Sequence, residues 1–192
     1  KNSGLISFDE LPLFFKCSNK SGNAVGNLPI PLNDSGVIPE QAFEVVNNVI
    51  KNMNIVLEQL IPNLTIGIKV IGTQTMKNGE TGYIIELISK KNKKEIALRY
   101  ESEGIKKIVS ILQLLIVVYN NDSITVAIDE LDSGIFEYLL GEILRIISEK
   151  GKGQLIFTSH NLRPLETIDK GFIAFTTTNV NNRYIRFSNV KN

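Results

Sequence analysis

The sequence predicts an α/β fold in which a parallel sheet core is flanked by helices and carries an antiparallel strand and helix insertion. Two observations support this prediction. Two short apolar runs, 124–128 and 154–158, are joined by a helical pattern over 135–148, and this order is typical of a right-handed βαβ unit. Earlier in the chain, the segments 83–88 and 96–100 flank a lysine-rich turn over 90–94, which indicates an antiparallel hairpin.

Composition excludes several function classes. The 192 residues suit one domain or a large part of one. A hydrophobic fraction of 43% rules out wholesale disorder, and a net charge of +1 provides no global field for nucleic acid or membranes. A single cysteine, Cys17, and a single histidine, His160, exclude an internal disulfide and a thiolate zinc site. We therefore expect a reducing, cytoplasmic compartment.

The first segment, residues 1–37, is expected to be mostly irregular and mobile. Ser, Gly, Asn and Pro dominate it from Cys17 onward, and these residues favour turns and loops. Residues 38–192 are expected to form one structured part. It begins with a helix that starts at Pro39, a residue suited to a first helical turn, and ends before Pro62. Apolar residues recur there at spacings of three and four, which predicts a core-facing helix and leaves a partner-binding seam as the alternative.

Three strands are expected to complete the insertion, which spans residues 38–100. Apolar and polar residues alternate over 64–70, as in a half-buried strand. Residues 83–88 and 96–100 flank the lysine-rich turn. These lysines are able to contact a phosphate backbone, although such a run is more often a solvated turn that discourages edge pairing.

The core is expected to span residues 101–192. The segment 105–119 is apolar nearly all round and predicts a deeply buried helix. Its most apolar run, 108–119, is too short to span a bilayer, which needs about 20 residues. The apolar runs 124–128 and 154–158 are continuous, which predicts strands covered on both faces. Two final strands are expected at 172–175 and 184–187.

Polar side chains follow both strands of the βαβ unit where each strand ends. Asp129 and Glu130 follow the first strand, and Ser159 and His160 follow the second. Because the carboxyl ends of parallel strands lie at one edge of a sheet, we expect these groups to converge in a functional site. An apolar strand followed by Asp-Glu is the Walker B arrangement. In it one carboxylate holds Mg²⁺ and its neighbour orients or deprotonates the water that attacks the γ-phosphate.

A second candidate site lies at the start of the buried helix, where Ser102 and Gly104 stand. Exposed N–H groups and the helix dipole favour phosphate at such a position. Gly lets the backbone approach, and Ser adds a hydroxyl. The alternative is an ordinary N-cap in which Ser102 only caps the helix.

Taken together, these motifs resemble those of ABC-type ATPases, in order and in approximate spacing. In the family, the three motifs concerned are, in this order along the chain, the signature loop, the Walker B motif and the switch histidine. The similarity is greatest to the AAA-annotated, ABC-like ATPases of the OLD and SMC-related group, which are found in bacterial defence and DNA-maintenance systems. It spans about residues 96–176 and is carried by Tyr100–Lys107, Ile128–Gly134 and Leu155–Asn161.

The resemblance implies an ATPase that uses ATP and Mg²⁺. It implies catalytic roles for Glu130 and His160, a metal-binding role for Asp129, and nucleotide contacts from Ser102 and Gly104. In the family, the signature of one subunit caps the nucleotide held by the other, which implies an ATP-dependent, head-to-tail homodimer. DNA or an associated nuclease is the implied further partner, and no membrane is involved.

Three departures from the family pattern matter. Glu103 stands where transporter signatures carry Gly, so the loop is not of the transporter type. Phe136 stands where many relatives place an Asp or His. No Walker A sequence occurs, and the chain begins with Lys1. We therefore expect the C-terminal half of an ATPase domain, inactive by itself.

Three other functions fit the sequence less well. A non-hydrolytic dimerisation or partner-binding module of the same fold remains the alternative. A serine hydrolase using Ser159, His160 and Asp129 lacks the Gly-x-Ser-x-Gly elbow. A Toprim-like nuclease needs an Asp-x-Asp pair, and Asp129 and Asp132 are one residue too far apart.

Overall fold

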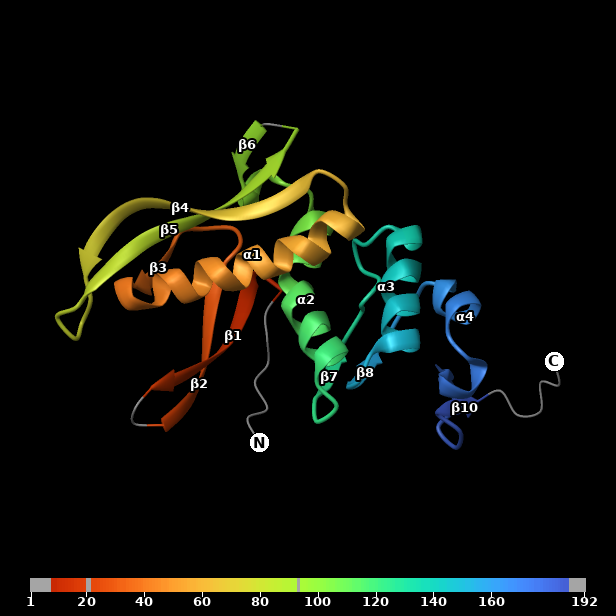
Figure 1. The fold of residues 1–192 in the computed structure, drawn as a ribbon. Coiled ribbons are helices and arrows are strands. Elements are labelled where there is room, and N and C mark those ends of the chain that lie inside the picture. Colours follow the sequence, from red (N-terminus) through yellow and green to blue (C-terminus); the bar gives the residue numbers. More distant parts are fainter. Residues whose placement is uncertain (1–7, 20–21, 93, 187–192) are drawn as a thin grey trace. The chain divides into compact units, whose positions relative to one another are not determined.

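The computed structural model describes residues 8–19, 22–92 and 94–186. The chain divides into two compact units, 1–117 and 118–192, and each is described by itself. The α/β fold class predicted from the sequence is confirmed by the mixture of parallel and antiparallel strands with helices (Figure 1).

The first unit is built on antiparallel strands. One sheet pairs β1 with β2, and a second has the order β3-β5-β4 with β6 also paired to β5. Figure 1 shows α1 lying along this second sheet. The elements are β1 (Glu10–Asn19), β2 (Gly22–Pro31), β3 (Gly36–Pro39), the 3-10 turn η1 (Glu40–Ala42), α1 (Phe43–Leu60), β4 (Leu64–Thr75), β5 (Thr81–Lys91), β6 (Lys94–Ala97), the 3-10 turn η2 (Leu98–Tyr100) and α2 (Glu103–Asn120), whose last residues belong to the second unit.

The prediction that residues 1–37 are mostly irregular is wrong for the described part. β1 and β2 form a ten-residue antiparallel ladder that runs from Glu10 opposite Pro31 to Asn19 opposite Gly22. Ser, Gly and Asn keep the backbone N–H and C=O groups that build such a ladder, so a composition rich in these residues did not prevent it. Residues 1–7, 20 and 21 lie outside the described residues.

The core-facing helix is confirmed, with a later start. A 3-10 turn follows Pro39, and the α-helix begins at Phe43. Its fully buried residues recur at spacings of four and three: Val46, Ile50, Met53 and Leu57. The same helix is fastened to β4 by Asn54, whose side chain donates to the carbonyl of Ile66 and accepts its N–H, both at 2.8 Å.

The basic hairpin is confirmed as an antiparallel pair of β5 and β6, although residues 98–100 form a 3-10 turn. Lys91 lies opposite Lys94 in the ladder, and the Lys90 ammonium lies 3.3 Å from the Glu95 carboxylate. Lys93 lies outside the described residues.

The second unit contains the βαβ unit. β7 and β8 are parallel and in register from Thr125 opposite Gln154 to Ile128 opposite Phe157, as predicted. Two short antiparallel strands follow; Phe187, expected at the end of the last one, lies outside the described residues. The elements are β7 (Thr125–Ile128), α3 (Glu137–Lys150), β8 (Gln154–Phe157), α4 (Arg163–Thr167), the 3-10 turn η3 (Lys170–Phe172), β9 (Ala174–Thr176) and β10 (Tyr184–Arg186).

The prediction that both strands are covered on both faces is wrong for the described chain. Ile128 is buried, but Thr125 and Ala127 are exposed, and Ile156 in β8 is 52% exposed. Successive side chains of a strand point to opposite faces, so the described residues cover one face of this pair and leave the other open.

By contrast, α2 is buried on most sides as predicted, and its buried apolar residues are Ile108, Val109, Ile111, Leu112, Leu114, Leu115 and Val118.

Candidate functional site

The ends of β7 and β8 bring together three of the predicted site residues. Asp129 and Glu130 directly follow β7, and His160 lies in the turn after β8. Nε2 of His160 lies 3.7 Å from Oε1 of Glu130, and the two side chains are 86% and 58% exposed. The convergence expected from parallel strands is therefore present, and a carboxylate and an imidazole face solvent side by side.

The backbone at Glu130 adopts a rare conformation. Its φ of +48° lies in the left-handed region, which residues other than Gly rarely occupy and which persists only where the surroundings hold it. The Glu130 N–H donates to the hydroxyl of Thr158 at 2.8 Å, and its carbonyl accepts the N–H of Ser133 at 3.0 Å. A strained residue fixed in this way at a strand end is typical of a functional site.

Thr158 also contacts the neighbouring carboxylate. Its hydroxyl donates a short hydrogen bond to Oδ1 of Asp129. The Thr158 side chain, which directly follows β8, thus bonds both Asp129 and Glu130, which directly follow β7. Sequence reasoning missed this role, although Thr158 stands directly before the Ser-His pair.

Asp132 provides a second link between the two turns. Its Oδ2 accepts the backbone N–H groups of His160 at 3.1 Å and Asn161 at 3.0 Å. The sequence places Asp132 in the turn after Asp129 and Glu130 and indicates no bonding partner for it. The structure gives this carboxylate a bonding role in the turn that carries the imidazole.

The family resemblance implies a divalent metal, which needs oxygen donors at the strand ends. Among the described residues, no group of three or more His, Cys, Asp or Glu side chains is placed to hold a metal ion. Mg²⁺ requires less, because it usually keeps several waters and takes one or two carboxylates together with substrate phosphates. Asp129 is exposed, and the hydrogen bond from Thr158 engages one of its two oxygens, Oδ1. Asp129 therefore fits the role of a single carboxylate ligand for Mg²⁺.

The predicted signature residues lie in the first unit. Ser102 precedes α2; its hydroxyl accepts the N–H of Ile105 at 3.3 Å, and its carbonyl accepts that of Lys106 at 3.1 Å. This is the bonding of an ordinary N-cap, the alternative weighed above. Gly104 lies in the first turn of α2, and Glu103 forms an ion pair with Lys106 at 2.6 Å.

The hydroxyl of Ser159 is engaged with the backbone. It donates to the carbonyl of Asn161 at 3.3 Å and accepts the N–H of the same residue at 3.1 Å. A serine nucleophile needs its hydroxyl bonded to a base, so this geometry does not favour the hydrolase alternative.

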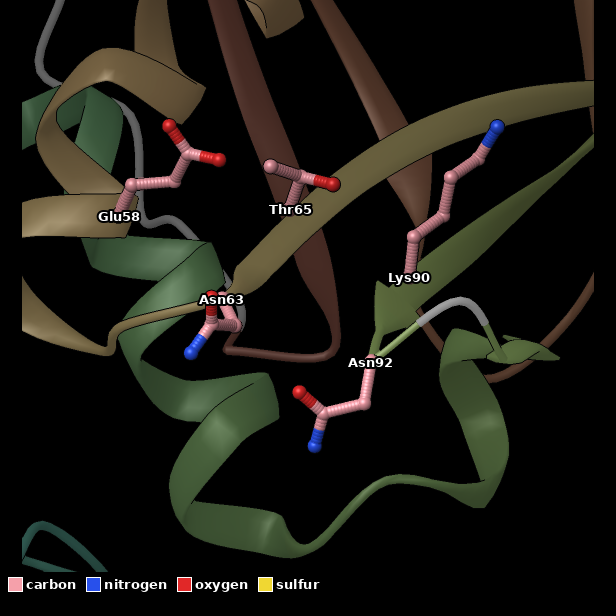
Figure 2. Close-up of a pocket in the computed structure, with 5 residues that line it drawn as sticks. All are labelled: Glu58, Asn63, Thr65, Lys90 and Asn92. Atoms are coloured by element: carbon pink, nitrogen blue, oxygen red, sulfur yellow. The ribbon is translucent and has the colours of Figure 1, made fainter.

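A separate open pocket of about 420 Å³ lies in the first unit (Figure 2). None of the predicted site residues lines it, and one carboxylate and one ammonium leave its lining without net charge. The lining residues come from α1, β4, β5 and the turns beside them: Glu58, Asn63, Thr65, Lys90 and Asn92.

No helix among the described residues is long and apolar enough to cross a membrane. No family model matches the chain, and no curated protein matches it.

Solved structures do match. One, described as "Structural biochemistry of ATP-driven dimerization and DNA stimulated activation of SMC ATPases", is 15% identical with a TM-score of 0.57. The match covers 77% of this chain and 89% of that one. Another is the Smc head domain with a coiled coil and joint from Pyrococcus yayanosii, at 15% identity and a TM-score of 0.56. It covers 76% of this chain and only 28% of that one. At this level of identity the likeness concerns the fold, and the chain is structurally similar to the ABC-type heads of SMC ATPases.

Proposed function

We propose that this chain is the C-terminal portion of an ABC-like ATPase, and that it supplies the Walker B and switch-histidine residues of the nucleotide site. The observation that carries the proposal is the placement of Asp129, Glu130 and His160 at the neighbouring ends of two parallel strands, with imidazole and carboxylate 3.7 Å apart. In an open parallel sheet, ligands bind outside these strand ends.

Each residue has a distinct chemical task in this proposal. Asp129 is the protein ligand for Mg²⁺, which when bound neutralises charge on the phosphates. Glu130 accepts a proton from the attacking water. His160 donates a hydrogen bond to a γ-phosphate oxygen or to that water. It is not a metal ligand, because the chain has no second His and only one Cys for a nitrogen- or sulfur-rich site.

The remainder of the site is proposed to come from elsewhere. Phosphoryl transfer needs a backbone cradle and a Lys on the phosphates, and the Walker A sequence that provides them does not occur in this chain. The chain by itself is therefore expected to leave ATP unhydrolysed and to bind it weakly.

Ser102 and Gly104 are proposed to contact the nucleotide held by a second subunit, in a head-to-tail homodimer that forms on ATP binding. The similar SMC ATPase is described with ATP-driven dimerisation and DNA-stimulated activation, which supports ATP as the trigger and DNA as a partner. A cytoplasmic role in DNA maintenance or phage defence fits such an enzyme.

The test uses the full-length protein with Mg-ATP. Calorimetry is expected to show that the wild type and Glu130→Gln both bind Mg-ATP. The rate of ATP hydrolysis by Glu130→Gln should be much lower than that of the wild type. Gln keeps the shape of Glu but does not accept the water's proton. Glu137→Gln, an exposed carboxylate at the start of α3, is the matched control and should hydrolyse normally.

Two outcomes would contradict the proposal. Equal hydrolysis by wild type and Glu130→Gln would remove the role assigned to Glu130. ATP-dependent dimerisation without any turnover by the wild type would instead favour a non-hydrolytic module.

A further inference from the structure

The turn after β7 is held by one residue from the end of β8. Thr158 hydrogen-bonds four consecutive residues, Ile128 to Leu131. Its N–H donates to the Ile128 carbonyl at 3.1 Å, and its carbonyl accepts the Leu131 N–H at 3.0 Å. Its hydroxyl accepts the Glu130 N–H and donates to Asp129.

The two side-chain bonds need a hydroxyl. A hydroxyl has one proton to donate and lone pairs to accept with, and here it gives its proton to the Asp129 carboxylate and accepts the Glu130 amide. Valine has nearly the shape of Thr and does neither, whereas serine does both. The backbone bonds of Thr158 are common to all three residues.

The two bonds act on different degrees of freedom. The bond to Oδ1 restricts the rotamer of an exposed carboxylate and leaves Oδ2 outside this bond. The bond to the Glu130 N–H holds a left-handed backbone, φ +48°, from which the Glu130 side chain projects beside His160.

We propose that Thr158 is a positioning residue that sets the geometry of Asp129 and Glu130 together through its hydroxyl. The inference rests on the proposed function for the tasks of those two carboxylates. Its structural part, a hydroxyl that holds the left-handed turn, stands without any nucleotide.

The experiment compares Thr158→Val and Thr158→Ser in the full-length protein. Thr125→Val is the matched control, because Thr125 lies at the opposite end of the same strand pair and its hydroxyl bonds only Gln154 among the bonds described, at 3.4 Å. The side chain of Thr158 lies on the exposed side of the strand end, so the valine variant is expected to fold. Thr158→Ala serves as a second hydroxyl-free variant.

The first readout needs no ATP. Amide hydrogen exchange, read from peptides that contain Glu130 in nucleotide-free protein, should be at least several-fold faster in Thr158→Val and normal in Thr158→Ser. The second is the Mg²⁺ concentration for half-maximal ATP hydrolysis, which should rise in Thr158→Val while kcat falls. Residues that orient a metal ligand typically change affinity or activity by about 10–100-fold.

Each failure has its own signature. An unchanged Mg²⁺ requirement in Thr158→Val, or a lowered melting temperature as its only effect, would overturn the positioning role. A serine variant as defective as valine would do the same. Wild-type protein that neither binds nor hydrolyses Mg-ATP would instead overturn the proposed function, and the exchange result would then decide only whether the hydroxyl holds the turn.

Discussion

The carboxylate of Asp132 accepts the backbone N–H of His160 at 3.1 Å and thereby ties the turn after β7 to the turn after β8. The same oxygen accepts the N–H of Asn161 at 3.0 Å. Two successive amides thus converge on one charged acceptor, and hydrogen bonds to charged groups are stronger than neutral ones. The position of His160 depends in this way on a residue 28 positions earlier in the chain.

Replacing Asp132 should therefore loosen the turn. We expect Asp132→Ala to lower the free energy of unfolding by about 1–3 kcal/mol, since it leaves two amides without their charged acceptor. Asp132→Asn keeps an oxygen in place and should cost less. Denaturant unfolding measures both, and equal losses for Ala and Asn would show that the charge, and not the acceptor, matters.

Removing the His160 imidazole should affect turnover and leave stability unchanged. The side chain is 86% exposed, and its described side-chain contact is Glu130 at 3.7 Å. Surface substitutions of this kind usually change stability by less than about 0.5 kcal/mol. In the full-length protein, His160→Ala should reduce ATP hydrolysis with an unaltered melting temperature. A large drop in melting temperature would mean that the imidazole is a structural group.

Asn54 offers a test of the first unit. Its amide makes two 2.8 Å hydrogen bonds to the backbone of Ile66 and so fastens α1 to β4. Asn54→Leu removes both bonds and should lower the free energy of unfolding by about 2–3 kcal/mol, because each buried partner left without a bond costs about 1–3 kcal/mol. Asn52→Leu, an exposed position on the same helix, is the control and should have little effect. Similar losses at both positions would contradict the fastening role.

The sequence was sufficient to predict the parallel strand pair and the convergence of Asp129, Glu130 and His160. Both follow from local information: two apolar runs, a helical pattern between them, and the rule that parallel strands end at one edge. The same reasoning was wrong about the burial of the two faces of this strand pair. A continuous apolar run predicts a strand buried on both faces, but Ile156 is half exposed in the described chain.

The links that hold the site were beyond local patterns. The side chains of Thr158 and Asp132 bond residues 28 or 29 positions away, and neither spacing nor periodicity indicates such pairs. The sequence also gives no indication of the left-handed φ of Glu130, because the position is not occupied by Gly, the residue that usually marks this conformation. The pairing of β1 with β2 was missed for a different reason. Residues that usually form turns, such as Ser, Gly and Asn, lie here within the paired strands.

The last prediction concerns Ser102 and the proposed dimer. Its hydroxyl caps α2 through the N–H of Ile105, so replacing it should cost about 1 kcal/mol of stability whatever else it does. Ser102→Ala and Ser102→Arg both lose this cap. Only arginine adds a bulky side chain where a phosphate of the second subunit's nucleotide is proposed to approach.

The measurement is light scattering after size exclusion, with ATP and with Glu130→Gln as the parent, since turnover is then blocked. We expect the parent to dimerise, Ser102→Ala to weaken the dimer, and Ser102→Arg to abolish it. Ser123→Arg, which places the same side chain in the exposed turn before β7, should dimerise like the parent and so excludes a general effect of added charge. A Ser102→Arg protein that dimerises as well as the parent would show that this helix start does not meet the nucleotide, and that Ser102 serves only as a cap.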